Sequence, residues 1–262
     1  MRRGTSAGAG PRAKVHSRSE PREPSRREAR EARGPVTLAI DVGGTGIKAL
    51  LLDPHGEPLT ERARVATPRP ATPARVLEAI LELVRPLGDF DRVSVGFPGV
   101  VVGDTVRTAP NLDGRWKGFP IARVLSLKLG RPVRALNDAG VQGYGVIEGK
   151  GTEMVLTLGT GMGTALYADG HYVPNLELAH HPFRGKKTYE DYVGGRALAK
   201  IGKAKWNRRV QKVIAQIDPV WNPRRIYLGG GNARHLRLAL PRHVSVTENV
   251  AGLLGGIALW RD

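Results

Sequence analysis

Two glycine-rich segments in this chain of 262 residues have the composition of a phosphate-binding turn. The first reads Gly43-Gly44-Thr45-Gly46, the second reads Gly159-Thr160-Gly161-Met162-Gly163, and each follows a short apolar run. Backbone N–H groups that no side chain blocks, together with a hydroxyl, suit an anionic phosphate. Neither segment is a Walker loop, because the Gly-Lys-Ser/Thr ending is absent, and a dinucleotide fingerprint needs a helix directly after the glycines. One such segment alone is more typical of a tight turn, whereas the pair favours a phosphate site.

Two aspartates at the ends of expected strands add to this pattern. Asp41 lies just before the first one, and Asp138, next to Asn137, begins another loop. An Asp at a strand end can hold hydrated Mg²⁺, which prefers carboxylate, water and phosphate oxygens, or it can stabilise an Asx-type turn. A second Asp can accept a hydroxyl proton during phosphoryl transfer, or it can cap a turn. With both aspartates present, an interpretation of the glycine segments as turns alone becomes improbable.

Apolar runs and helical spacings predict the elements that position these residues. Strands are expected at 36–40, 47–52, 93–97 and 133–136, the first two forming a hairpin through the first glycine segment and the last delivering Asn137 and Asp138 at its tip. Amphipathic helices are expected at 74–86 and 120–129.

The pattern of strand, glycine segment and strand starts again at 154–158 and 164–167. A basic helix at 196–217, a strand at 226–228 and a closing helix around 250–257 follow. Such a duplication predicts two similar α/β domains that face one another. We expect an N-terminal domain at 35–136, joined by a C-terminal helix at 248–262, and a C-terminal domain at 137–247.

Composition excludes several classes of protein. The absence of cysteine excludes structural disulfides, thiolate-bound zinc, iron–sulfur clusters and a cysteine nucleophile, and it is compatible with a reducing compartment. No apolar run approaches the roughly 18 residues that a membrane span needs, and the N-terminus lacks the apolar region of a signal peptide. The net charge of +17 favours polyanionic ligands. Residues 1–34 are poor in apolar side chains, so we expect a disordered basic tail, more plausibly a dispensable extension than a polyanion-binding arm.

The motifs resemble those of the ROK sugar kinases, within the superfamily of sugar kinases, actin and heat-shock ATPases. The stretch 41–48 is similar to the first phosphate motif of that family, and the blocks at 96–99, 109–112, 137–139 and 158–163 follow in the same order. Glu177-Leu178-Ala179-His180 corresponds to its Glu-x-Gly-His sugar motif. The resemblance covers about residues 36–262 and implies two ribonuclease H-like domains of the actin and hexokinase type, flanking a cleft.

One departure from the family points to a particular branch of it. The family usually continues with a cysteine-rich zinc loop that ends in a sugar-contacting Glu, whereas this chain has no cysteine and reads Glu190-Asp191-Tyr192-Val193 at the end of that loop. Together with Lys205-Trp206-Asn207 and the stretch 228–232, this looks like the zinc-free branch of polyphosphate glucokinases and glucomannokinases. A zinc-dependent geometry for His180 is therefore not expected.

The resemblance implies a role for each candidate residue. Asp138 is the general base on the 6-hydroxyl of glucose, and the sugar-binding residues are Gly99, Asn111, Asn137, Asp138, Glu177, His180 and Glu190. The donor-binding residues are Asp41, Gly43, Gly44, Thr45, Lys48, Thr157, Gly159, Thr160, Gly161, Gly230, Gly231 and Asn232, with Asp41 holding Mg²⁺ through water.

The implied activity is transfer of the terminal phosphoryl group of inorganic polyphosphate, and also of ATP, to glucose by a cytoplasmic homodimer that binds neither membrane nor specific nucleic acid. An alternative is an ATP-dependent kinase for mannose, fructose or an aminosugar. A sugar-responsive ROK-type regulator ranks lower, because the tail has no room for a winged helix-turn-helix. Basic residues could track a phosphate chain or form a solvated helix face: Lys186, Lys187, Arg196, Lys200, Lys203, Lys205, Arg208, Arg209 and Lys212.

Overall fold

A computed structural model describes residues 34–174, 176–247 and 251–261 of the chain. The expected tail lies outside these ranges except for Gly34. Within the described residues, no helix is both long and apolar enough to cross a bilayer.

The first sheet contains the first glycine segment. It has the strand order β3-β2-β1-β4-β7, built from β1 (Thr37–Val42), β2 (Gly46–Leu52), β3 (Ala63–Ala66), β4 (Arg92–Phe97) and β7 (Val133–Asn137). The first three strands are antiparallel neighbours, whereas β4 and β7 continue the sheet in parallel with β1. The expected strands and the hairpin are therefore confirmed.

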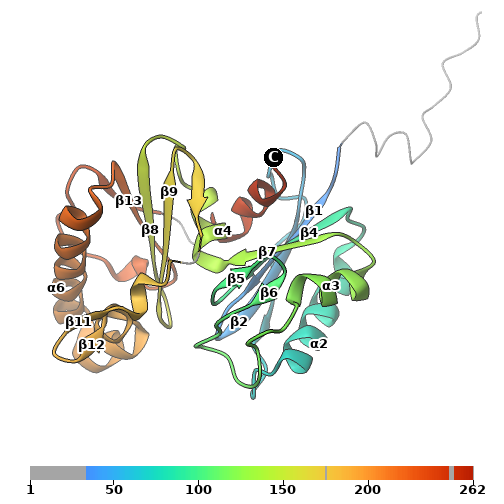
Figure 1. The fold of residues 1–262 in the computed structure, drawn as a ribbon, viewed down its shortest axis with the longest axis horizontal. Helices are drawn as coiled ribbons and strands as arrows, with labels where there is room; N and C mark the ends of the chain where they lie inside the picture. The colour runs from blue at the N-terminus through green and yellow to red at the C-terminus, as the bar shows by residue number, and fades with distance from the viewer. Residues whose placement is uncertain (1–33, 175, 248–250, 262) are drawn as a thin grey trace, which may run out of the picture.

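The second sheet repeats this topology around the second glycine segment. Its order is β10-β9-β8-β13-β14, built from β8 (Thr152–Leu158), β9 (Met162–Ala168), β10 (His171–Val173), β13 (Arg225–Gly229) and β14 (Val244–Val246). Again three antiparallel strands are followed by two parallel ones. The internal duplication is confirmed, and Figure 1 shows the two sheets in separate halves of the molecule with α4 between them.

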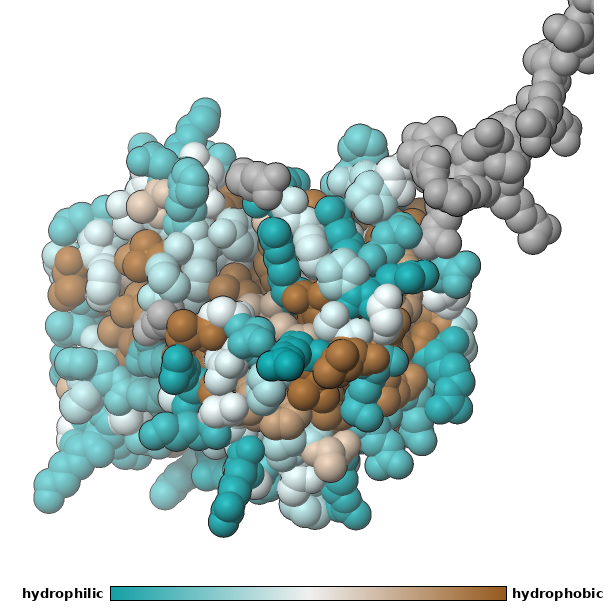
Figure 2. Space-filling model, turned by 45° about the vertical axis from the view of Figure 1, so that its right-hand side comes forward, coloured by the Kyte–Doolittle hydropathy of each residue, from teal (hydrophilic) through white to brown (hydrophobic). Residues whose placement is uncertain are grey.

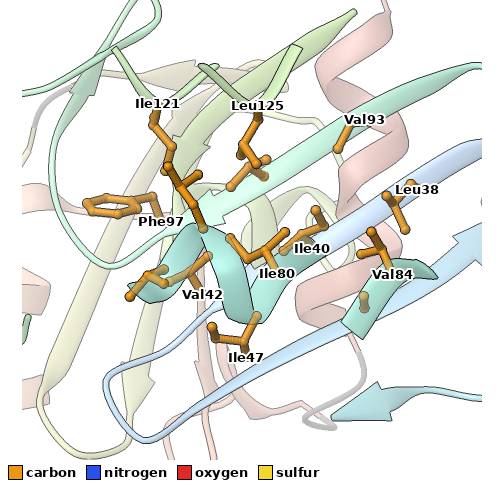
Figure 3. Packing of buried hydrophobic residues seen from close by; sticks show 14 of the residues in the cluster. Leu38, Ile40, Val42, Ile47, Ile80, Val84, Val93, Phe97, Ile121 and Leu125 are labelled. Atoms are coloured by element: carbon orange, nitrogen blue, oxygen red, sulfur yellow. The ribbon is translucent and has the colours of Figure 1, made fainter. Parts of the chain in front are cut away.

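Strand alternation gives each sheet two buried faces. On one face of the first sheet, Leu38, Ile40 and Phe97 pack against the helices α2 (Pro73–Val84) and α3 (Ile121–Leu129), as Figure 3 shows. On the other face, Ala39 and Leu52 pack against the C-terminal segment, α7 (Ala251–Leu254) and η4 (Gly255–Trp260).

The second sheet is covered in the same way by α6 (Gly195–Trp221) on one face and α4 (Asp138–Tyr144) on the other. The expected helix at 196–217 is present but interrupted, because Gly202 has φ 73° and ψ 165°. Sequence analysis missed α4, which begins where a loop was expected, because its seven residues include two glycines and lack a clear apolar period.

Short elements complete the chain. They are η1 (Arg85–Leu87), β5 (Val101–Val102), β6 (Thr105–Val106), η2 (Leu178–His180), β11 (Pro182–Arg184), β12 (Lys187–Thr188), α5 (Tyr189–Val193) and η3 (Ala233–His235). Figure 2 shows hydrophilic side chains around most of the outline of one face, in keeping with the high charge of the chain.

The C-terminal segment, which covers one face of the first sheet, contacts α4, which covers one face of the second sheet. A Cβ on Gly255 would lie 1.8 Å from the carbonyl oxygen of Val141 in α4, so this contact is possible only for glycine. Arg92 and Arg134 lie over the ring of Trp260, and its Nε1 donates to Ser94 Oγ at 2.8 Å. The C-terminal segment is thus anchored on the first sheet while it packs against the helix of the second.

This contact yields a stability prediction. Gly255→Ala should lower the free energy of unfolding by about 3 kcal/mol, because backbone atoms of α4 would have to move. Gly256→Ala is the matched control, since its Cβ would meet only Ser94 and Ala39 side chains, at 3.1 and 3.3 Å, and it should cost less. Urea unfolding of both variants measures the difference, and equal losses would contradict the argument.

Candidate active site

A cavity of about 710 Å³ contains both glycine segments and both aspartates. The sugar-binding and donor-binding candidates from the sequence all line it: Asp41, Gly43, Gly44, Thr45, Lys48, Gly99, Asn111, Asn137, Asp138, Thr157, Gly159, Thr160, Gly161, Glu177, His180, Glu190, Gly230, Gly231 and Asn232. Of the basic residues that could track a phosphate chain, Arg196 alone lines it. Residues from both sheets therefore share one hollow.

Asn137 is the last residue of β7 in the first sheet, and Asp138 is the first residue of α4. The carboxyl ends of the parallel strands β1, β4 and β7 lie at one edge, which brings Asp41 and Asp138 to the same end of the sheet. Asn137 Oδ1 accepts the N–H of Gly140 and so caps α4, while its Nδ2 donates to the carbonyl oxygen of Gly99, both at 3.2 Å. One side chain thus fixes the start of the helix and the turn after β4.

The carboxyl group of Asp138 is unusually basic for an aspartate. Burial, followed by the negative charge of Asp41, raises its pKa from 3.8 to about 7, although the N–H of Ala139 acts in the opposite direction. Asp41 pairs with Lys48 across the β1–β2 hairpin, where Nζ and Oδ2 are 2.7 Å apart. A carboxylate with a pKa near neutrality is suited to take up and release a proton.

Further carboxylates gather on the second sheet's side of the cavity. Glu177 Oε2 lies 3.1 Å from Nε2 of His180, and burial raises the pKa of Glu177 while His180 partly offsets this. Glu190 Oε2 accepts the N–H of Met162 at 3.1 Å. Gly161 leaves room for this carboxylate, because a Cβ there would lie 2.0 Å from Glu190 Oε2.

A capping box and aromatic rings hold the loop that carries Glu190. Thr188 and Asp191 form a reciprocal capping box at the start of α5, with both backbone–side-chain distances at 3.1 Å. Phe183 packs against Tyr189 and Tyr192, with ring centroids 4.5 and 5.0 Å apart. Hydrogen bonds and ring packing therefore position this segment.

Neighbouring elements fix the shape of the second glycine segment. Asn232 Nδ2 donates to the carbonyl oxygen of Gly159 at 2.7 Å, and the N–H of Gly195, at the start of α6, donates to that of Thr160 at 2.9 Å. Gly230 has φ 83° and its Cβ would lie 2.5 Å from the Leu158 carbonyl oxygen, so the loop approaches β8 as only glycine allows.

The first glycine segment is held in a similar way. The N–H of Gly43 donates to the Gly46 carbonyl oxygen at 3.0 Å, and Thr67 Oγ1 donates to the carbonyl oxygen of Gly43 at 2.6 Å. Arg69 donates to the carbonyl oxygen of Gly44 at 2.7 Å. Both segments are therefore preorganised turns rather than loose loops.

Sequence reasoning missed several lining residues, among them Arg62, Arg64, Gln142 and Arg234, and it placed Arg196 only in a basic stretch. The two arginines of the β3 region were missed because that edge strand was not expected. Gln142 follows Asp138 by one helical turn, a spacing that an assignment of α4 would have revealed. Its Nε2 is buried and has no hydrogen-bond partner among the described residues.

The residues fit a magnesium ion held mainly by water and phosphate. Within the described ranges, no group of three or more His, Asp or Glu side chains could form a dedicated metal cage. Mg²⁺ usually keeps several waters and uses one or two carboxylates beside substrate phosphates. Asp41, at the edge of the first sheet and in the lining of the cavity, is a carboxylate of this kind.

Comparison with known proteins agrees with this architecture. The model of the ROK family matches residues 37–175. The chain belongs to the ROK family. The polyphosphate glucokinase of Mycobacterium tuberculosis (strain CDC 1551 / Oshkosh) is 33% identical over 239 residues, which cover 83% of this chain and 88% of the relative.

Two solved structures extend the comparison. The inorganic polyphosphate/ATP-glucomannokinase of Arthrobacter sp. strain KM is 34% identical and superposes with a TM-score of 0.78 over 87% of this chain and 100% of that one. A ROK family glucokinase from Streptomyces griseus, 22% identical with a TM-score of 0.74 over 86% of this chain and 98% of that one, shares the fold. The actin and hexokinase-type fold expected from the sequence is thus confirmed.

The raised pKa of Asp138 makes a prediction about stability. Because its pKa rises from 3.8 to about 7 on folding, ionisation of the carboxyl group lowers the stability of the folded state as pH increases between these values. Asp138→Asn removes this effect, so its free energy of unfolding should exceed that of the parent above about pH 7, and this gain should fade towards about pH 4. Urea unfolding across this range measures the gain, and a gain independent of pH would contradict the assignment.

Proposed function

We propose that the chain transfers the terminal phosphoryl group of inorganic polyphosphate, and also of ATP, to the 6-hydroxyl of glucose, which yields glucose 6-phosphate. The observation that carries the proposal is the single cavity in which Asp138, with a pKa of about 7, lies with a set of carboxylates and two glycine segments. The similarity to the polyphosphate glucokinase of Mycobacterium tuberculosis and to the inorganic polyphosphate/ATP-glucomannokinase of Arthrobacter supports polyphosphate and ATP as donors and glucose as acceptor.

Glucose is bound by side chains that accept or donate hydrogen bonds at fixed angles. Asn111, Asn137, Glu177, His180 and Glu190 take this role, with Gly99 at the turn beside them. Most of them are already oriented: Glu177 by His180, Glu190 by Met162 and Asn137 by Gly99 and Gly140. Preorganised partners of this kind select a hexose by its ring hydroxyls.

Asp138 is the general base. As O6 attacks the terminal phosphorus, its proton passes to the Asp138 carboxylate, and the bond from that phosphorus to the bridging oxygen breaks. The shortened polyphosphate, or ADP, leaves with the electron pair. Positioning and charge neutralisation account for most of the acceleration.

The donor lies along the two glycine segments. Lys48 and the backbone of 43–45 face it from the first sheet, and the residues 157, 159–161 and 230–232 face it from the second. Asp41 would hold a bound Mg²⁺, with water completing the contact, and such an ion would supply neutralisation of charge on the transferred group. Closure of the two halves excludes water that would otherwise accept the phosphoryl group.

We also propose that the enzyme is a cytoplasmic homodimer. The resemblance to the zinc-free ROK branch supports the dimer, and the absence of cysteine is compatible with a reducing compartment. Sedimentation equilibrium tests the oligomeric state.

A parallel donor assay tests the function itself. Purified protein should form glucose 6-phosphate from glucose with either long-chain polyphosphate or ATP. The same assay with mannose, fructose and an aminosugar tests the alternative acceptors. Failure of glucose with both donors would overturn the proposal.

The role of Asp138 predicts the effect of its removal. Asp138→Asn should lower kcat by about 10²–10⁴-fold, as is typical for a general base, while the fold is kept. In the parent, kcat/KM for glucose should fall as the pH drops below about 7, because the carboxylate becomes protonated. A variant with nearly normal turnover, or a parent without this acid limb, would remove Asp138 from the mechanism.

Gly161→Ala tests the position of Glu190. The added Cβ would lie 2.0 Å from Glu190 Oε2, so the carboxylate must move away from its place. We expect KM for glucose to rise about tenfold, the effect of losing roughly 1.4 kcal/mol, while KM for the donor changes less. Glu190→Gln should act in the same direction, and the double variant should add little to either one. A fully additive double variant would contradict this coupling.

A further inference from the structure

A second cavity, of about 630 Å³, adjoins the active-site cavity, because Arg234 lines both. Its cationic and titratable lining residues are Lys203, Arg208, Arg234, His235 and Arg237. None of the described residues that line it is acidic. We call this cavity, defined by these five residues, the basic groove.

The fold holds the walls of the basic groove together. One wall is α6 beyond its break at Gly202, and the other is η3 with the residues that follow it. Asn207 joins them, since its Nδ2 donates to the carbonyl oxygen of His235 at 3.0 Å and its Oδ1 accepts the N–H of Arg237 at 2.6 Å. The buried Trp206 next to it anchors α6 by donating to the carbonyl oxygen of Val193 at 2.7 Å.

The positive charge of the groove is not neutralised from within. Within the described part of the chain, no carboxylate oxygen lies within 4.0 Å of a side-chain nitrogen of Lys203, Arg208, Arg234 or Arg237. Burial lowers the pKa of His235, and the charges of Lys203, Arg234 and Arg237 lower it further. Uncompensated positive charge in a concave surface attracts an anion from solution.

We infer that the basic groove binds the phosphates of a polyphosphate chain that lie beyond those in the active-site cavity. This inference rests on the proposed function and specifies its donor. The phosphate chain would leave the active-site cavity past Arg234, which lines both cavities and follows Gly230 and Gly231 of the first one in the sequence. Cationic side chains suit a repeated phosphate better than the nucleoside end of ATP, which carries no charge of its own.

The structure divides the basic residues of α6 into those that line the groove and those that lie outside it, a distinction that the sequence alone does not make. Lys203 and Arg208 line it, whereas Lys205 and Lys212 lie on the same helix, exposed and outside both cavities. Lys203 and Arg208 are themselves exposed, so substituting them should leave the fold intact. The chain therefore offers two pairs of substitutions with equal change of charge.

The experiment compares Lys203→Gln/Arg208→Gln with the control Lys205→Gln/Lys212→Gln. Titration calorimetry measures Kd for long-chain polyphosphate and for tripolyphosphate, which is short enough to fill only the active-site cavity, and thermal unfolding checks the fold of each variant. The groove pair should weaken long-chain binding about tenfold through lost charge-assisted contacts, and tripolyphosphate binding less than about twofold. The control pair should leave both almost unchanged.

Other outcomes overturn the inference. If both pairs of substitutions weakened the binding of long-chain polyphosphate equally, the total charge of the protein and not the groove would be responsible. If the groove pair weakened the binding of long-chain polyphosphate and of tripolyphosphate equally, its effect would be on the active-site cavity. A parent that binds long-chain polyphosphate no better than tripolyphosphate would also refute it. The proposed function is tested independently, because it requires that the parent form glucose 6-phosphate, which calorimetry does not measure.

Discussion

The architecture depends on one covalent junction, the peptide bond between Asn137 and Asp138. Asn137 ends a strand of the first sheet, and Asp138 begins the helix that packs on the second. The same residue pair therefore connects the two sheets and places the Asp138 carboxyl group in the cavity. The capping bond from Gly140 to Asn137 keeps this junction short and defined.

The second connection between the halves runs in the opposite direction. The C-terminal segment returns to the first sheet, where Leu253 and Ile257 pack on Ala39 and Leu52, and Gly255 presses against α4. Two helical segments that cross at glycine contacts can slide or tilt with small changes in packing.

Sequence reasoning succeeded where chemistry and periodicity coincided. The hairpins around the glycine segments follow from apolar runs that end in glycine, and their duplication follows from the repeat of that pattern. It failed where tertiary contacts decide the structure. The helix at Asp138 is stabilised by packing against Tyr167 and the C-terminal segment, and Arg234 approaches the cavity because Asn207 and Asn232 fix the loop around it. Neither contact leaves a local signal in the sequence.

The loop of Glu190 shows how a site residue can keep its place when a metal ligand set is absent. In this chain a capping box sets the first turn of α5, and three aromatic rings fix the hairpin before it. The carboxylate then reaches the backbone of the second glycine segment, where Oε2 accepts the N–H of Met162 and fills the space that a Cβ on Gly161 would need. Local hydrogen bonds and apolar packing are therefore sufficient to orient this residue in a chain without cysteine.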